Sequence, residues 1–93
     1  MATPMETLQA EAPDVASDGL DARTKQIAYI AIKAAQGDAT AVALHVPLAK
    51  GLGASRAEVR DAVLLSLTTS GLTEVMKCLP AALQAYDVVD GDA

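Results

Sequence analysis

The sequence predicts an all-α fold, a compact bundle of about four core helices, on the basis of three observations. No segment alternates apolar and polar residues in the manner of a strand. Apolar residues instead recur at helical spacing in four segments, each preceded by a capping residue or a glycine break. The connections between these segments are short, which makes consecutive helices antiparallel neighbours.

The first core helix is expected over residues 22–36, with Asp21 as its N-cap. Its polar side chains fall on one arc of a helical wheel: Lys25, Gln26, Tyr29, Lys33 and Gln36. Isoleucines and alanines occupy the remaining arc. This apolar arc is wide, as expected of a helix buried by more than one neighbour.

The second core helix is expected over residues 38–52, after the break at Gly37. Asp38 stands at its start, and glycines at 51 and 53 provide its exit. Pro47 falls on the outer face, where the loss of one backbone hydrogen bond is tolerable. The opposite face forms one continuous seam: Asp38, Ala41, Val42, His45, Ala49 and Leu52.

Two further helices complete the bundle. Ser55 and Glu58 form a capping box, which predicts a third helix running to about Thr69. After the break at residues 70–71, a fourth helix is expected over residues 73–87. Its predicted inward residues are Val75, Cys78, Leu79, Ala82, Leu83 and Tyr86.

The chain is thereby divided into three parts. Residues 1–19 form an N-terminal arm, either loose or packed on a neighbour, in which a helical turn or two is expected before Pro13. Residues 20–87 form the helical domain, and residues 88–93 an acidic tail.

The composition predicts that the protein associates with itself. The chain is 52% hydrophobic but contains no Phe and no Trp, so most of its apolar side chains are small. A short chain with small apolar side chains buries little area alone. We therefore expect it to complete its core against copies of itself.

Charge and cysteine content restrict the partners and the location. A net charge of -5 with scattered basic residues argues against nucleic acid. No run approaches the length of a membrane span, and the N-terminus lacks the features of a signal peptide. One cysteine allows no internal disulfide, which makes a cytoplasmic location the default expectation.

Several strings of residues resemble the carboxymuconolactone decarboxylase-like superfamily, which includes the alkylhydroperoxidase D-like proteins. The resemblance rests on the run Leu-Asp-Ala-Arg-Thr-Lys-Gln-Ile at 20–27, on His45 after a glycine break, and on Gly-Ala-Ser followed by Glu-Val at 53–59. It covers about residues 20–86. It implies an all-helical subunit that assembles into trimers or hexamers.

The resemblance also implies where a site would lie. In the alkylhydroperoxidase D-like branch, a Glu on the first core helix precedes a Cys-x-x-Cys pair and a His on the second. These positions hold Gln26, Asp38, Ala41 and His45 in this chain. A peroxide-reducing dithiol needs two adjacent sulfurs, one held as thiolate. Peroxidase activity is therefore disfavoured, and Cys78 is expected to be a small buried apolar residue.

The decarboxylase branch requires no cysteine, metal or organic cofactor. The resemblance thus implies cofactor-free lyase or isomerase chemistry on a small carboxylated lactone or keto acid, with His45 moving the proton. Basic residues available to a carboxylate are few: Arg23, Lys25, Lys33, Arg56 and Arg60. The alternative is a non-catalytic oligomeric binding or scaffold protein in which the site has decayed.

Each candidate site residue has a structural interpretation as well. His45 is either a proton-transfer group, since histidine ordinarily titrates near neutral pH, or a core histidine. About 10 Å along the helix separates Asp38 from His45, which is too far for a direct bond. Asp38 therefore either acts on the opposite end of a ligand that His45 contacts or is simply an N-cap. Gln26 either reaches the face of the second core helix that carries His45 or is a surface amide. Tyr29 is expected on the solvent or interface side. One His and one Asp at this spacing do not predict a metal site.

Overall fold

The computed structural model describes residues 1–11 and 19–88. The predicted end of the arm helix at Pro13, and the acidic tail beyond Val88, lie outside these residues. The helices are α1 (Pro4–Glu11), α2 (Ala22–Ala35), α3 (Ala39–Gly51), α4 (Arg56–Leu64), α5 (Ser66–Thr69) and α6 (Leu72–Asp87).

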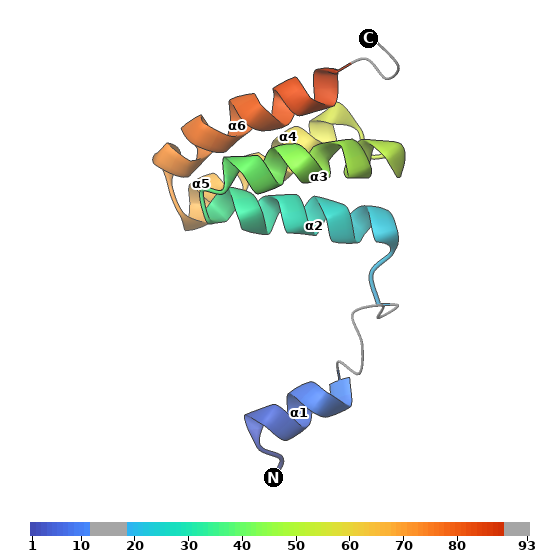
Figure 1. Cartoon of the computed structure of the whole chain (residues 1–93). Coiled ribbons are helices and arrows are strands. Elements are labelled where there is room, and N and C mark those ends of the chain that lie inside the picture. Colours follow the sequence, from blue (N-terminus) through green and yellow to red (C-terminus); the bar gives the residue numbers. More distant parts are fainter. Residues whose placement is uncertain (12–18, 89–93) are drawn as a thin grey trace.

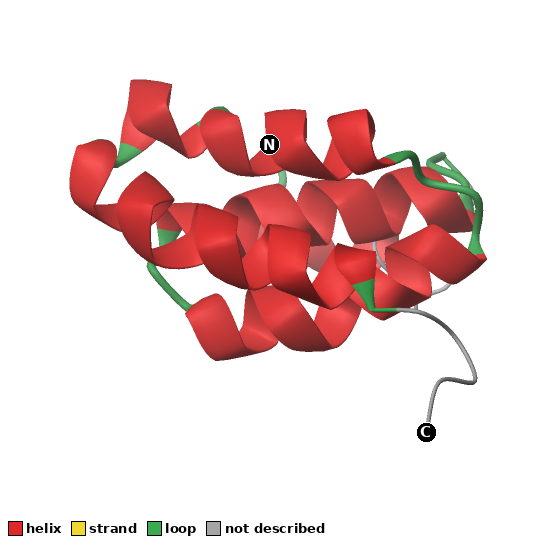
Figure 2. Cartoon of the chain, turned by 90° about the horizontal axis from the view of Figure 1, so that it is seen from above, coloured by secondary structure: helices red, strands yellow, loops and turns green. Residues whose placement is uncertain are grey.

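The predicted all-α fold is confirmed. In the described part of the chain every regular element is a helix, and short turns connect those of the bundle (Figure 2). Helices α2, α3, α6 and α4 form a four-helix bundle in that cyclic order, because α2 and α6 each pack against both α3 and α4 (Figure 1). The short helix α5 continues from α4 and packs on α2 and α6.

Three of the helix starts are fixed by the caps that the sequence predicts. The Asp21 carboxylate accepts a hydrogen bond from the Thr24 amide at 2.7 Å. The Ser55 hydroxyl accepts from the Glu58 amide at 3.0 Å, and the Ser55 amide donates back to Glu58 at 2.9 Å. These bonds satisfy amide groups that the first turn of a helix leaves without partners. Asp38 caps α3 in the same way, as described below.

The turn between α2 and α3 depends on Gly37, whose φ of 72° lies in the left-handed region. Its amide donates to the Ala34 carbonyl at 2.9 Å, and the next amide, of Asp38, donates to the Lys33 carbonyl at 3.0 Å. Glycine adopts this backbone conformation without the steric cost that a Cβ would bring. The tight turn sets α2 and α3 side by side, which brings Gln26 and His45 within reach of each other.

The predicted third helix, to about Thr69, is interrupted at Leu65. Ser66 is buried, and its hydroxyl donates to the Val63 carbonyl at 2.6 Å. A serine that bonds to the preceding turn competes with the backbone ladder. The chain therefore forms two successive helices, α4 and α5, where the sequence pattern indicates one.

The core lies between the four bundle helices and contains small aliphatic side chains for the most part. Its buried members are Ile30, Ala34, Val42, Val46, Ala49, Ala54, Val59, Ala62, Val63, Cys78 and Ala82. The inward residues predicted for α6 are confirmed as buried or half-buried. Ile30 is the largest of the fully buried side chains.

The buried face of α3 is rotated relative to the predicted seam. Val46, absent from that seam, is fully buried, whereas Leu52 is 45% exposed and Asp38 is exposed. The reason is that α3 packs against α2 on one side and α6 on the other. The centre of its buried face therefore points between these two helices, at Val46. Pro47 is exposed, on the outward side where it was predicted.

Candidate functional site

The structure brings His45 and Gln26 together across the interface between α2 and α3. Nδ1 of the His45 ring lies 3.0 Å from Oε1 of Gln26, and both side chains are half-buried. Gln26 therefore reaches His45, which is one of the two positions expected for it; the other was that of a surface amide. An amide oxygen accepts, so the Nδ1 proton is donated to Gln26 and Nε2 carries the lone pair of the neutral ring.

Tyr29 supports the imidazole from its flat side. The two ring centroids are 4.0 Å apart with an interplanar angle of 33°. The Tyr29 ring is half-buried and packs on His45 of its own chain, and its position at an interface between subunits stays a prediction. Gln26 and Tyr29 are three residues apart, and residues at that spacing share one face of a helix. That spacing is the signal in the sequence that could have placed both residues beside His45.

Lys33 extends the same face of α2. Its ammonium nitrogen lies 5.5 Å from the centroid of the Tyr29 ring, within the range of a cation–π contact. No carboxylate in residues 1–11 and 19–88 forms an ion pair with Lys33. The cluster formed by Gln26, Tyr29, Lys33 and His45 is called the imidazole site below.

Asp38 is not joined to His45. Its Oδ1 accepts a hydrogen bond from the Ala41 amide at 3.0 Å, so the carboxylate serves as the N-cap of α3. No hydrogen bond connects Asp38 with the imidazole among the residues that the structure describes.

The arginines that the sequence offers to a carboxylate ligand are engaged elsewhere. Arg23 pairs with Glu58, joining α2 to α4. Arg56 binds both carboxylate oxygens of Asp87, at 2.9 and 3.1 Å, joining α4 to α6. The remaining arginine, Arg60, pairs with its neighbour Asp61 at 3.0 Å. These contacts hold helices together or lie on the surface, away from the imidazole site.

Cys78 is fully buried in the core, and its Sγ lies 3.8 Å from the Ala34 carbonyl oxygen. Burial raises the pKa of its thiol, which disfavours the reactive thiolate. Its prediction as a small buried apolar residue is confirmed.

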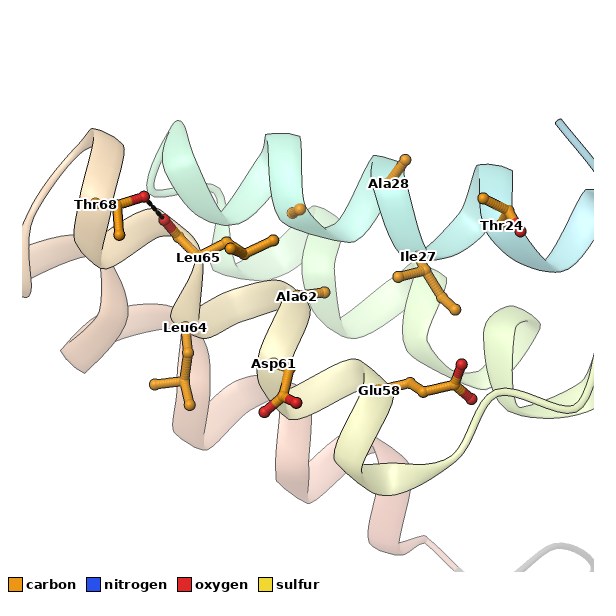
Figure 3. Close-up of a pocket in the computed structure, with 10 residues that line it drawn as sticks. Thr24, Ile27, Ala28, Glu58, Asp61, Ala62, Leu64, Leu65 and Thr68 are labelled. Carbon is orange, nitrogen blue, oxygen red and sulfur yellow. Dashed lines mark hydrogen bonds between the residues drawn. The ribbon is translucent and has the colours of Figure 1, made fainter. Parts of the chain in front are cut away.

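A separate hollow of about 650 Å³ lies between α2 and the α4–α5 segment (Figure 3). Its lining contains none of the residues of the imidazole site. It is formed by Thr24, Ile27, Ala28, Ala31, Glu58, Asp61, Ala62, Leu64, Leu65 and Thr68. The α2 residues of the hollow lie on the opposite face of that helix from Gln26 and Tyr29, as the helical period requires.

Among residues 1–11 and 19–88, no three His, Cys, Asp or Glu side chains gather in a way that could hold a metal ion. No helix within the described ranges combines the length and apolar character needed to cross a membrane.

Fold and site together define a small all-helical subunit with one histidine on its second core helix, held by residues of the first. A model of the Carboxymuconolactone decarboxylase family matches residues 2–84, and the chain belongs to this family. The match includes α1 as well as the bundle. Comparison with curated proteins and with solved structures gave no match.

Proposed function

We propose that the protein is a cofactor-free lyase or isomerase that acts on a small carboxylated lactone or keto acid at the imidazole site. The observation that carries the proposal is the contact between His45 Nδ1 and Gln26 Oε1 at 3.0 Å, under the ring of Tyr29. A proton-transfer group must be held in one orientation, and this contact fixes both the tautomer and the direction of the ring. The other nitrogen, Nε2, has no hydrogen-bond partner among the described residues.

Lys33 supports a carboxylate substrate. Its ammonium group lies 5.5 Å from the centre of the Tyr29 ring, which itself packs on the imidazole, and it forms no ion pair with the described carboxylates. A cation held beside an aromatic ring is suited to bind a carboxylate and to stabilise a neighbouring enolate.

The chemical step proposed for a keto acid is a decarboxylation. The bond between the α-carbon and the carboxyl carbon breaks, CO₂ leaves, and the bonding electron pair enters the adjacent carbonyl to form an enolate. His45, protonated at Nε2, then delivers that proton to the α-carbon and takes another from water. Positioned proton transfer of this kind contributes on the order of 10²–10⁴-fold to rate.

Assembly and location belong to the same proposal. Leu44, Leu48 and Leu52 are 68%, 52% and 45% exposed and form a stripe along α3, beside His45. A second subunit covering this stripe would shield the imidazole site from water, in a homotrimer or homohexamer.

The single buried cysteine supports a cytoplasmic location, where thiols stay reduced.

The experiment is a set of variants assayed on a panel of β-keto acids and carboxylated lactones, following CO₂ release. His45→Gln is expected to lower kcat/KM about 10²-fold or more, because the amide cannot transfer the proton. Lys33→Gln should mainly raise KM for carboxylated substrates. Gln84→Ala, on the exposed side of α6, is the matched control and should behave as the unchanged protein.

A binding or scaffold role is the second candidate, favoured by the commitment of Asp38 to helix capping. It predicts no turnover of any compound in the panel, together with binding of a carboxylate that Lys33→Gln weakens. Peroxidase activity is disfavoured, because Cys78 is fully buried and Asp38 and Ala41 occupy the two cysteine positions of the related branch.

A further inference from the structure

Helix α1 has a small apolar side that packs on no other helix among the described residues. It contacts no other helix, and none of its residues is buried (Figure 1). Pro4, Met5 and Leu8 gather on one side, and the latter two are 60% and 57% exposed. Glu6 lies on the other side, and Glu11, the last residue of the helix, borders the apolar side next to Pro4. Helices shorter than about 12 residues are marginal alone, so this eight-residue helix needs a surface to pack against.

The hollow beside α2 has the form that such a helix requires. A second hollow, of about 320 Å³, adjoins it and shares Ala31, Leu65 and Thr68 with it. Together they form a trough along α2 from Thr24 to Ala35, which is about 17 Å long at the α-helical rise. Helix α1 is about 12 Å long by the same measure and fits within it.

The lining of the trough suits an apolar helix. Ala28, Ala31 and Ala62 form much of its floor, and small side chains let a second helix come close. Leu65 points toward α2 and gives the trough an apolar wall, as Figure 3 shows. This leucine is 61% exposed in the isolated chain and would be covered by an occupant.

The charges on the rim do not oppose this contact. Glu58 and Asp61 line the trough, but they are paired with Arg23 and Arg60. The incoming apolar side of α1 therefore meets no unpaired carboxylate at these two positions. Glu6, on the other side of the helix, would remain in solvent, and Glu11 would lie at the C-terminal end of the contact.

We propose that α1 of one copy of the chain lies in the trough of a second copy. A second copy is favoured because α1 stands off its own bundle, the arrangement of an element available for exchange. The bundle also buries no side chain larger than isoleucine completely, so it gains from intermolecular apolar contact. The proposal is independent of catalysis, since the trough and His45 lie on opposite faces of α2.

Cross-linking between differently marked chains tests the position of α1. In a Cys78→Ser background, chains carrying Leu8→Cys are mixed with chains carrying Thr68→Cys and treated with a short bismaleimide. The expected product is a dimer that joins residue 8 of one chain to residue 68 of the other, identified by peptide mass spectrometry. Ala10→Cys, on the opposite side of α1, is the matched control and should cross-link much less.

The same two cysteines placed in one chain separate the two possible occupants. A linkage within single chains as the main product would overturn the proposal, because α1 would then fill the trough of its own chain. Equal cross-linking from residues 8 and 10 would overturn it as well, since no defined face of α1 would be involved.

Sedimentation of the full chain provides an independent readout. Met5→Glu with Leu8→Glu should weaken self-association about tenfold or more, because two apolar side chains lose their burial. The bundle should keep its helical circular dichroism, since α1 contacts no other helix. Ala10→Glu, on the opposite side of α1, should leave the association constant unchanged. An unchanged constant in the double variant would overturn the proposal.

Discussion

His45 is held by a neutral acceptor, and this determines what the imidazole site can do. Gln26 fixes the ring through Nδ1 without adding a negative charge. A carboxylate in the same place would stabilise the imidazolium. The amide instead orients the ring without adding a charge beside it, which suits a positioned proton-transfer group.

The effect of this contact can be measured, because His45 is the single histidine of the chain and its ring protons give one signal set in NMR spectra. Gln26→Glu should raise the midpoint of its titration, since the new carboxylate faces Nδ1 directly. Gln84→Glu adds the same charge on the exposed side of α6 and should shift the midpoint far less. Equal shifts in the two variants would show that Gln26 does not contact the ring in solution.

A second prediction at this scale concerns Cys78. Its burial, and the raised pKa of its thiol, predict that it reacts with a thiol reagent at least about 100-fold more slowly in the folded protein than in urea. The rate of colour release from an aromatic disulfide reagent measures this ratio. Rapid reaction of the folded chain would mean that the core opens at α6 and would reopen the question of sulfur chemistry.

At the scale of elements, one residue at the start of α3, Asp38, has two proposed roles, one structural and one chemical. The Asp38 carboxylate accepts from the Ala41 amide, so its structural role is visible in the geometry. The resemblance to the alkylhydroperoxidase D-like branch implies that Asp38 stands at the position of that branch's first cysteine, which is the basis of its proposed chemical role. Stability and turnover can separate the two roles.

Asp38→Ala should lower the free energy of unfolding by about 1 kcal/mol, because the Ala41 amide loses its acceptor. Asp38→Asn keeps an oxygen acceptor and should cost only a few tenths of a kcal/mol. Urea unfolding at one protein concentration measures both, which matters in a chain expected to self-associate. If turnover is found, its retention in Asp38→Asn would assign Asp38 to capping alone, and its loss would give the carboxylate a chemical role.

At the scale of the whole molecule, ion pairs between helix ends connect the bundle. Arg23–Glu58 joins α2 to α4, and Arg56–Asp87 joins α4 to α6. The Ser55 amide, followed by Arg23, holds the pKa of Glu58 below its ordinary value of 4.5. The Arg56 guanidinium holds the pKa of Asp87 below its ordinary value of 3.8.

These lowered pKa values predict loss of stability in acid. A carboxyl with a lower pKa in the folded state stabilises the fold above its ordinary pKa, and the contribution disappears as the pH falls through the lowered value. The free energy of unfolding should therefore decrease as the pH falls below about 4.5, and salt should reduce the effect because both pairs are partly exposed.

Asp87→Asn provides the matched test of this dependence, since it keeps the shape of the side chain and removes its titration. Its unfolding free energy, measured in urea between about pH 5 and pH 3, should fall less steeply than that of the unchanged chain. Glu11→Gln, on α1, controls for the change in net charge. Identical slopes in all three proteins would contradict the assignment of Asp87 to the interhelical pair.

Much of the fold follows from residues close together in the sequence. Ser55 and Glu58 form their reciprocal cap within one turn, and Asp21 and Asp38 each bond to the amide three residues on. Such contacts need only local backbone geometry, so spacing predicts them. The positive φ at Gly37 is local in the same sense. Helix class, and the starts of α2, α3 and α4, were determined at this level.

The site was decided by tertiary structure. Gln26 and His45 are 19 residues apart, and whether an amide on one helix meets an imidazole on another depends on how the helices are rotated about their axes. That rotation is set by packing, which also buried Val46, exposed Leu52 and placed Tyr29 on the imidazole. The sequence by itself determined that His45 lies on the second of four core helices. Only the packed bundle determined that a neutral amide and an aromatic ring hold it, because side chains on separate helices meet only once those helices are in place.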